Sequence, residues 1–293
     1  MKILITGATG FIGKNVLPKL KDEVVVYKGS ILNKNDLEKN FPVDVVYHLA
    51  AVLDESHTLL WHINVDGIKN VAELCKKYNA KMIYLSSSGV LGETKEPAKE
   101  NYPYNPETKY ESSKVEAEKI IVSSGINYTI IRAPILIGPN DLWLKILKKM
   151  EKMPVIGLGE NKFHLAYIDD VVDLLAYVKD KKESDKQIYH IATPDIPTYL
   201  DVYRFVRKEL GINSEEKHTN IYLVYMISFL NSFYCKIIGG KQNLFLMKST
   251  IQRLVRNRML STEKLKQIGF KPKYDTKKAL KETIKYFRDR EML

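Results

Sequence analysis

A tyrosine and a lysine four positions apart are the side chains in this sequence best suited to moving a proton. Tyr110 and Lys114 fall in a helical pattern after the turn at Pro103 and Pro106, so both side chains lie on one helix face. A phenol has a pKa of about 10 and is a poor base at neutral pH, but a neighbouring ammonium favours the phenolate. The pair therefore predicts proton exchange with an alcohol or ketone oxygen.

Three consecutive serines stand upstream of this pair. An apolar run that ends at Tyr84-Leu85 delivers Ser86, Ser87 and Ser88 to the point where the run stops. If the run is a strand of an open parallel sheet, this is the edge at which ligands bind. A hydroxyl there can hold the substrate oxygen while the tyrosine exchanges its proton. The alternative is that the serines only form a polar loop.

A glycine-rich stretch lies at the start of the chain. The apolar run 2–6 leads directly into Gly7, Gly10 and Gly13, and an amphipathic helical pattern follows. Gly7 permits a sharp turn, Gly10 leaves room for a pyrophosphate, and Gly13 allows the helix to pack closely on the strand. The start of that helix offers unpaired N–H groups to an anion. The pattern predicts a dinucleotide-binding loop made by Gly7, Thr9, Gly10, Phe11, Ile12 and Gly13.

The residue that would choose between NAD and NADP(H) lies after the second apolar run. An acid about 20 residues beyond the glycine loop would bind the adenosine ribose and select NAD. At that point the sequence reads Val26-Tyr27-Lys28-Gly29-Ser30, without Asp or Glu. Lys28 could pair with a 2′-phosphate, or it could be an ordinary surface lysine. We therefore expect an NAD(P) cofactor, with NADP(H) slightly favoured.

Alternating apolar runs and amphipathic segments must position these groups. Such alternation is typical of a parallel sheet with helices on both faces. The predicted strands cover 2–6, 24–27, 43–49, 81–86, 128–132 and 187–192, and the predicted helices cover 11–21, 35–40, 57–78, 109–123, 141–152 and 168–179. The fold class is thus α/β, a Rossmann-type doubly wound parallel sheet. We assign residues 1–152 and 165–193 to an NAD(P)-binding domain, and 153–164 and 194–293 to a smaller, mostly helical substrate-binding region.

Composition narrows the class of protein. Of 293 residues, 45% are hydrophobic and 28% charged, which is usual for a globular chain and excludes a disordered or collagen-like one. The net charge of +11 comes from lysines dispersed along helical segments, which favours a solvated surface over a nucleic-acid partner. Two cysteines are too few for a disulfide framework or a four-ligand zinc site. We predict no metal site, no signal peptide and a reducing, cytoplasmic location.

One apolar segment stands out in the second half of the chain. The uncharged run 220–235 is 16 residues long, whereas a spanning helix needs about 20. We therefore predict no transmembrane segment, although a helix here could lie on a membrane surface or line an apolar pocket. The other interpretation of 221–238 is a helix that packs in the core or between two subunits.

Taken together, these motifs make the chain resemble an extended short-chain dehydrogenase/reductase of the NAD-dependent epimerase/dehydratase family. The resemblance covers nearly the whole chain, with the motifs in family order. Its segments are 6–13, 46–51, 64–67, 86–92, 110–114, 132–134 with 138–139, 167–171, 261–265 and 269–272.

The resemblance also implies roles for individual residues. Ser87 would be the catalytic hydroxyl, Tyr110 the acid/base and Lys114 its partner, which also contacts the nicotinamide ribose. A helix-packed homodimer is usual in this family. The remaining cofactor contacts that the resemblance implies are Leu49, Ala50 and Ala51, which pass under the cofactor, and Pro134, which flanks the nicotinamide.

The same resemblance bears on the type of reaction. Relatives that are 4,6-dehydratases carry an Asp-Glu pair after the catalytic hydroxyl residue, whereas this chain has Ser88-Gly89. Dehydration is therefore disfavoured. Epimerisation and net reduction or dehydrogenation both need only Ser87, Tyr110 and Lys114, so the sequence does not separate them.

The substrate class depends on the C-terminal region. Arg253, Arg256 and Arg258 could bind a diphosphate, which favours a nucleotide sugar held by Ser87, Ser88 and Arg256. The apolar segment 221–238 resembles steroid- or flavonoid-type reductases instead. Our main hypothesis is an NAD(P)-dependent epimerase or oxidoreductase acting on a nucleotide sugar. The alternatives are an enzyme for an apolar hydroxy-ketone and a non-catalytic NAD(P)-binding sensor or assembly protein.

Overall fold

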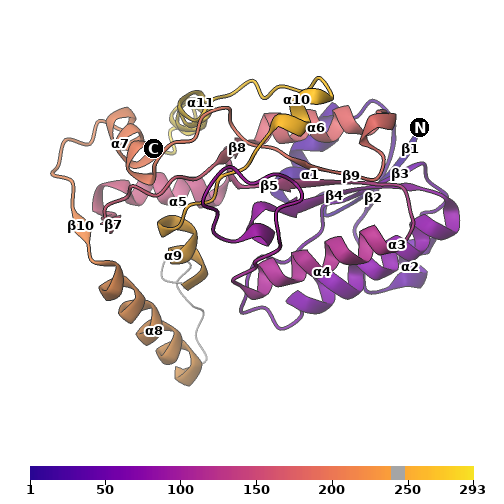
Figure 1. Cartoon of the computed structure of the whole chain (residues 1–293), viewed down its shortest axis with the longest axis horizontal. Helices are drawn as coiled ribbons and strands as arrows, with labels where there is room; N and C mark the ends of the chain where they lie inside the picture. Colours follow the sequence, from indigo (N-terminus) through magenta and orange to yellow (C-terminus); the bar gives the residue numbers. More distant parts are fainter. Residues whose placement is uncertain (239–247) are drawn as a thin grey trace.

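A six-stranded parallel sheet forms the centre of the molecule (Figure 1). The computed structural model describes the backbone of residues 1–238 and 248–293 and the side chains of 1–235 and 250–293. The strand order is β2-β1-β3-β4-β5-β9, so the chain reverses its direction of travel across the sheet between β1 and β3. The strands are β1 (Lys2–Thr6), β2 (Glu23–Tyr27), β3 (Val45–His48), β4 (Lys81–Ser87), β5 (Tyr128–Ala133) and β9 (Gln187–His190).

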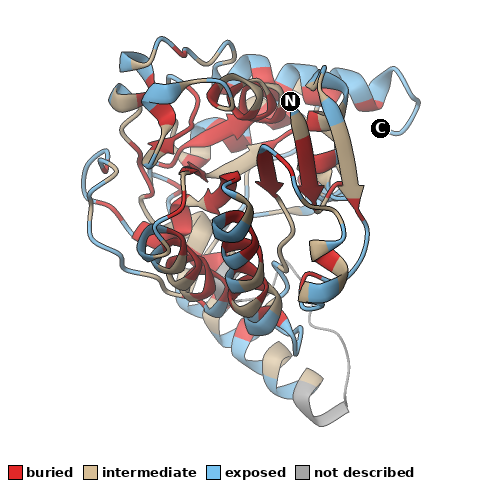
Figure 2. Cartoon of the chain, turned by 90° about the vertical axis from the view of Figure 1, so that its right-hand side faces the viewer, coloured by how far each residue is buried: buried red, intermediate tan, exposed pale blue. Residues whose placement is uncertain are grey.

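Helices cover both faces of this sheet because alternate strand residues point to opposite sides. Ile3 and Ile5 of β1 belong to one apolar cluster, while Leu4 between them belongs to the other. The first cluster includes α1 (Phe11–Val16) and α6 (Ile168–Val178), and the second includes α2 (Lys34–Glu38), α3 (Gly67–Tyr78) and α4 (Lys109–Ser123). Figure 2 shows the buried layer that results between the helices. The predicted α/β fold is confirmed.

Most of the remaining elements lie beyond the carboxyl side of the sheet, whereas α10 lies beside α6 and contacts β9 (Figure 1). β6 (Ile135–Ile137) pairs with β8 (Leu165–Tyr167), and β7 (Val155–Ile156) pairs with β10 (His218–Thr219). The helices are α5 (Asp141–Lys149), α7 (Tyr199–Glu209), α8 (Ile221–Ile238), α9 (Lys248–Val255), α10 (Glu263–Gln267) and α11 (Thr276–Arg288). The division into a cofactor domain and a substrate region stays a prediction.

Two predicted helices differ from the observed ones, each for a local reason. The helix predicted over 11–21 ends at Val16, where a short 3₁₀ turn containing Pro18 follows, since proline has no N–H to continue the helix. The helix predicted over 57–78 begins as a π-helical turn at His62–Asp66 and becomes α-helical from Gly67. Such turns are frequent at functional sites.

The apolar helix α8 does not pack into the chain's own core. Eight of its large apolar side chains are exposed, including Tyr222 at 80% and Phe229 at 70%. The core interpretation of 221–238 is therefore wrong for the described side chains. Among the described residues, no helix is long and apolar enough to cross a bilayer.

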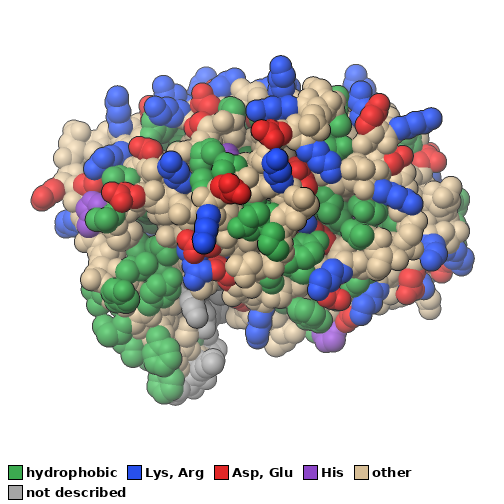
Figure 3. Space-filling view, viewed as in Figure 1, with side chains coloured by type: hydrophobic (Ala, Val, Ile, Leu, Met, Phe, Trp, Pro, Cys, Tyr) green, Lys and Arg blue, Asp and Glu red, His purple; other side chains and the backbone are tan. Residues whose placement is uncertain are grey.

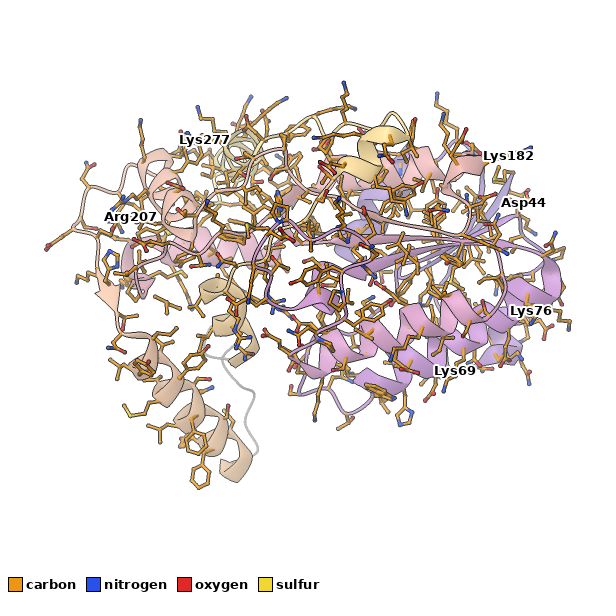
Figure 4. The ribbon with its side chains drawn as sticks, in the orientation of Figure 1. Asp44, Lys69, Lys76, Lys182, Arg207 and Lys277 are labelled. Atoms are coloured by element: carbon orange, nitrogen blue, oxygen red, sulfur yellow. The ribbon has the colours of Figure 1, made fainter. Side chains whose placement is uncertain are left out.

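The positive charge is spread over several elements. Lys69 and Lys76 project from α3, Lys182 follows α6, and Lys277 lies on α11 (Figure 3, Figure 4). Acidic side chains are interspersed on the face that Figure 3 shows. This distribution is that of a mixed solvated surface.

Candidate active site

The strand register brings three loops to one edge of the sheet. Thr6 lies opposite His48, and His48 lies opposite Tyr84, so β1 and β3 end side by side and β4 continues past them to Ser87. The Thr6 hydroxyl and His48 Nδ1 are 2.8 Å apart, and the His48 ring stacks on Tyr84. Burial, assisted by the nearby Lys114, lowers the pKa of His48 to about 3, so this histidine is neutral. It holds the edge together and carries no positive charge.

Two glycines of the loop at this edge, Gly7 and Gly13, leave no room for a side chain. Gly7 has φ +74°, and a Cβ added there would lie 2.5 Å from the backbone nitrogen of Ala50. A Cβ on Gly13 would lie 2.4 Å from the Gly7 carbonyl oxygen. A Cβ on Gly10 would meet only that oxygen, at 3.3 Å, so Gly10 is otherwise open. The loop therefore packs on Leu49-Ala50 and presents backbone at Gly10, which fits the pyrophosphate of a dinucleotide.

The predicted catalytic group comes together beside this loop. Ser87 ends β4, and its hydroxyl lies near the phenol of Tyr110 on α4 and acts to lower the pKa of that phenol. The same hydroxyl accepts the Gly89 N–H at 3.1 Å, which fixes its position. Lys114 lies one turn along α4, and its Nζ is 5.9 Å from the centre of the Tyr110 ring. Ser87 and Tyr110 thus lie together, with the Lys114 ammonium one helical turn away.

Lys114 is held by groups other than Tyr110. Its Nζ donates to the Tyr84 hydroxyl at 3.1 Å and to the Leu85 carbonyl at 3.0 Å. Burial lowers the pKa of Lys114 to about 7, against the charge of Glu118, which raises it. The ammonium is thus only partly charged near neutral pH.

Burial is also the largest influence on the pKa of the Tyr110 phenol. It raises the pKa of Tyr110 to about 12, while Arg253 and the Ser87 hydrogen bond act to lower it. The guanidinium carbon of Arg253 lies 5.7 Å from the centre of the Tyr110 ring. The sequence predicts Lys114 as the cation near this phenol, and the structure adds Arg253 as a second cation at a similar distance, whose charge lowers the pKa of Tyr110. Lys114 is turned towards Tyr84 and Leu85 instead.

An asparagine ties the loop after β3 to helix α4. The Asn64 side chain accepts the Val52 N–H and donates to the Val52 carbonyl, both at 2.9 Å. Its amide also donates to the Ser113 hydroxyl, which in turn donates to the Tyr110 carbonyl at 2.7 Å. Asn64 therefore positions the tyrosine's own turn of helix. The only signal for it in the sequence is the motif 64–67.

The arginines after α8 are engaged with carboxylates of α4 and the loop before it. Arg258 pairs with Glu111 at 2.7 Å and with Glu107 at 2.8 Å, and Arg256 also pairs with Glu107. Arg253 lies 3.9 Å from Glu111. Substrate binding by Arg256 stays a prediction. Sequence reasoning missed Glu107 and Glu111. Their only signal in the sequence is that they stand four positions apart, just before Lys114.

Two predicted cofactor contacts lie at separate points of the same edge. Lys28 follows β2, which is the edge strand, and its side chain is exposed. Pro134 is partly buried between β5 and β6. Their contacts with a cofactor stay predictions, as do those of Leu49, Ala50, Ala51, Thr9, Phe11 and Ile12, and substrate binding by Ser88 stays a prediction too.

Comparison with known families decides the assignment. The profile of the NAD dependent epimerase/dehydratase family matches residues 3–192, which include the glycine loop, Ser87, Tyr110 and Lys114. The chain belongs to this family. The predicted resemblance is thereby confirmed, and the family is that of an NAD-dependent enzyme.

Family members of known activity match over almost the whole chain. An N-acetyl-alpha-D-glucosaminyl-diphospho-ditrans,octacis-undecaprenol 4-epimerase of Escherichia coli O157:H7 is 25% identical, over 97% of this chain and 94% of its own. A UDP-glucose 4-epimerase of Vibrio cholerae is 26% identical, over 97% and 95%. The solved UDP-glucose 4-epimerase of Thermotoga maritima with UDP-glucose has the same fold, with a TM-score of 0.76, 22% identity and coverage of 99% and 100%.

Proposed function

We propose that this family member moves a hydride between NAD(P) and a secondary alcohol or ketone carbon of a nucleotide sugar, as an epimerase or oxidoreductase. The observation that carries the proposal is that Ser87 at the end of β4 and Tyr110 on α4 lie near each other at the edge that carries the glycine loop, with Lys114 one turn away. That arrangement is a proton relay at the edge where a parallel sheet binds ligands.

The residues of this edge fit a dinucleotide. The loop 7–13 would hold the pyrophosphate, Leu49 to Ala51 would lie under the cofactor, and Pro134 would flank the nicotinamide. When bound, the nicotinamide supplies hydride chemistry, which no side chain can supply. The protein contributes orientation and the handling of the proton.

Tyr110 and Ser87 divide the handling of the substrate oxygen. With its pKa raised to about 12 by burial, Tyr110 is a protonated phenol at neutral pH and can donate its proton to a carbonyl oxygen. In the opposite direction the phenolate accepts the proton of the alcohol, and the positive charge of Arg253 stabilises that phenolate. The Ser87 hydroxyl, held by the Gly89 N–H, keeps the substrate oxygen in reach.

The position after Ser88 argues against dehydration. A Cβ on Gly89 would lie 2.6 Å from Cγ of Glu111, which is fully buried. The acidic side chain that dehydratases carry there has no space, because Glu111 occupies it. Epimerisation and simple oxidation or reduction need no such group.

The substrate proposal follows from the relatives and from the exposed helix α8. The epimerases of Escherichia coli O157:H7 and Vibrio cholerae act, by their names, on a sugar attached to a diphosphate. One diphosphate is joined to a nucleoside and the other to a long lipid. We take the nucleotide sugar as the first candidate. The exposed apolar helix α8 favours the lipid-linked sugar as the second.

The test of catalysis is Tyr110→Phe, which removes one oxygen and keeps the ring. Turnover of UDP-glucose, UDP-N-acetylglucosamine or a prenyl-diphosphate sugar should fall by about two to four powers of ten, because the acid/base is lost. Cofactor binding, followed by fluorescence of the reduced nicotinamide, should persist. A steroid substrate would support the apolar hydroxy-ketone alternative instead. A sensor would bind cofactor and show no turnover in either form.

We also propose that Lys28 gives a preference for NADP(H). It is exposed at the end of the edge strand, where a 2′-phosphate would lie. Lys28→Ala should weaken NADPH binding by about tenfold and leave NADH binding unchanged, since only NADPH carries the second phosphate. Equal loss for both cofactors, or none, would contradict the preference.

Location and assembly complete the proposal. Cys75 and Cys235 form no disulfide, and burial raises the pKa of the Cys75 thiol to about 12, which suits a reducing compartment such as the cytoplasm. The family resemblance supports a homodimer, which light scattering of the purified chain would test.

A further inference from the structure

Helix α8 has the reverse of the usual pattern of a surface helix. Its large apolar side chains point to solvent, and they fall on one continuous arc of about 160° at 3.6 residues per turn. The opposite side carries Ser228, which is 2% exposed, and Val224, which is also buried. The exposed set is Tyr222, Leu223, Met226, Ile227, Phe229, Leu230, Phe233 and Tyr234.

The inner side of the helix is the more polar one. Asn231 and Ser232 lie beside Ser228 on that side and are partly buried. The amide nitrogen of Asn231 is buried and makes no hydrogen bond to the described part of the chain. A soluble helix would place these groups outward. Figure 1 shows α8 extending away from the sheet, and Figure 3 shows the apolar mass at its end.

The charged Lys, Arg, Asp and Glu positions in the sequence around α8 are all occupied by Lys or Arg, so this segment is positive. From Lys217 to Thr262 there is no Asp or Glu, whereas there are four lysines and three arginines. The arginines reach the carboxylates of Glu107 and Glu111. The lysines are Lys217, which precedes the apolar run in the sequence, and Lys236, Lys241 and Lys248, which come after it.

We infer that α8 seats the protein on the surface of an anionic lipid bilayer, with its apolar arc among the acyl chains. Interfacial helices combine a wide apolar face with lysines that attract anionic headgroups. Tyr222 and Tyr234 stand near the two ends of the arc, and tyrosine is enriched at the level of the headgroups. The helix lies on the bilayer and does not span it.

A second copy of the chain is the competing occupant. A helix that packs against one partner helix needs a narrow stripe, whereas this arc is wide and carries four aromatic rings. The excess of positive charge in this segment would also repel that of a second copy, since the segment has no acidic residue to offset it. Both features favour lipid.

The test is flotation of the full chain with vesicles, without cofactor or substrate, so that it does not depend on the proposed reaction. The wild type should float with vesicles of equal parts phosphatidylglycerol and phosphatidylcholine. Phe229→Ser with Phe233→Ser should lower this binding by more than about tenfold, because two apolar rings leave the bilayer. Leu158→Ser, which changes an exposed leucine outside α8, should bind as the wild type does.

A local probe keeps the result specific to the helix. Tryptophan fluorescence of Phe229→Trp should shift to shorter wavelength on adding these vesicles, and that of Leu158→Trp should not. Equal binding by all variants would overturn the proposal. Binding that ignores phosphatidylglycerol would overturn its charge component. A dimer that the double serine variant dissociates, with no vesicle binding, would assign α8 to a second copy.

Discussion

At the scale of residues, the site depends on how burial sets two pKa values in opposite directions. The pKa of Tyr110 is raised to about 12 and the pKa of Lys114 is lowered to about 7, because burial removes solvation from the charged form of each group. A neutral phenol beside a partly neutral amine is a stable resting state. The phenolate needs a cation, and Arg253 from α9 lies 5.7 Å from the ring centre, while Lys114 at 5.9 Å is only partly charged.

Arg253→Gln should therefore raise the pKa of Tyr110 and slow the oxidative half-reaction, which needs the phenolate. The limb of the pH profile of kcat that reports Tyr110 should move to higher pH. Arg253→Lys keeps the charge and should show a smaller shift. A limb that stays in place in the glutamine variant would show that Arg253 does not act on the phenol.

At the scale of elements, the contact between the glycine loop and the loop after β3 is the critical one. Gly7 and Gly211 have nearly the same φ, +74° and +73°, but a Cβ at Gly211 would meet nothing within 4 Å. The two positions thus share the conformational cost of an added Cβ and differ in the steric one. At Gly7 both costs bear on function, because a pyrophosphate needs exposed backbone, and no side chain, at this turn.

Gly211→Ala should lower the free energy of unfolding by about 1–2 kcal/mol, the cost of a left-handed conformation. Gly7→Ala should lower it further, because its Cβ would overlap the backbone of Leu49 and Ala50. It should also abolish binding of NADH. Chemical denaturation and fluorescence titration measure the two effects. Equal losses of stability in both variants would mean that the loops separate easily.

At the scale of the whole molecule, three buried histidines link stability to pH. Burial lowers the pKa of His48 and His190 to about 3 and that of His164 to about 4. These histidines come from β3, β9 and the strand-rich region before β8, and none takes up a proton in the folded state at pH 5. The unfolded chain binds protons there from about pH 6.5 downward.

Stability should therefore fall as the pH drops from 7 to 5, by about 2 kcal/mol for each of these histidines. Stability falls, and does not rise, as the pH drops, because the histidines of the unfolded state bind protons more readily than those of the folded state. Thermal or urea unfolding at several pH values would measure the slope. His57→Gln changes an exposed histidine and should leave the slope as it is. A free energy of unfolding that is flat across this window would contradict the account.

The sequence by itself determined the local features. Alternating apolar runs specified the strands of the sheet, and the glycine loop and Tyr110 to Lys114 specified the family, because each depends on neighbours within one or two turns. Only the tertiary structure decided which distant groups meet. It brought Arg253 to a phenol 143 positions earlier, filled the space at Gly89 with Glu111, and turned the apolar arc of α8 outward. Periodicity gives the face of a helix, but burial of that face depends on contacts between segments far apart in the chain.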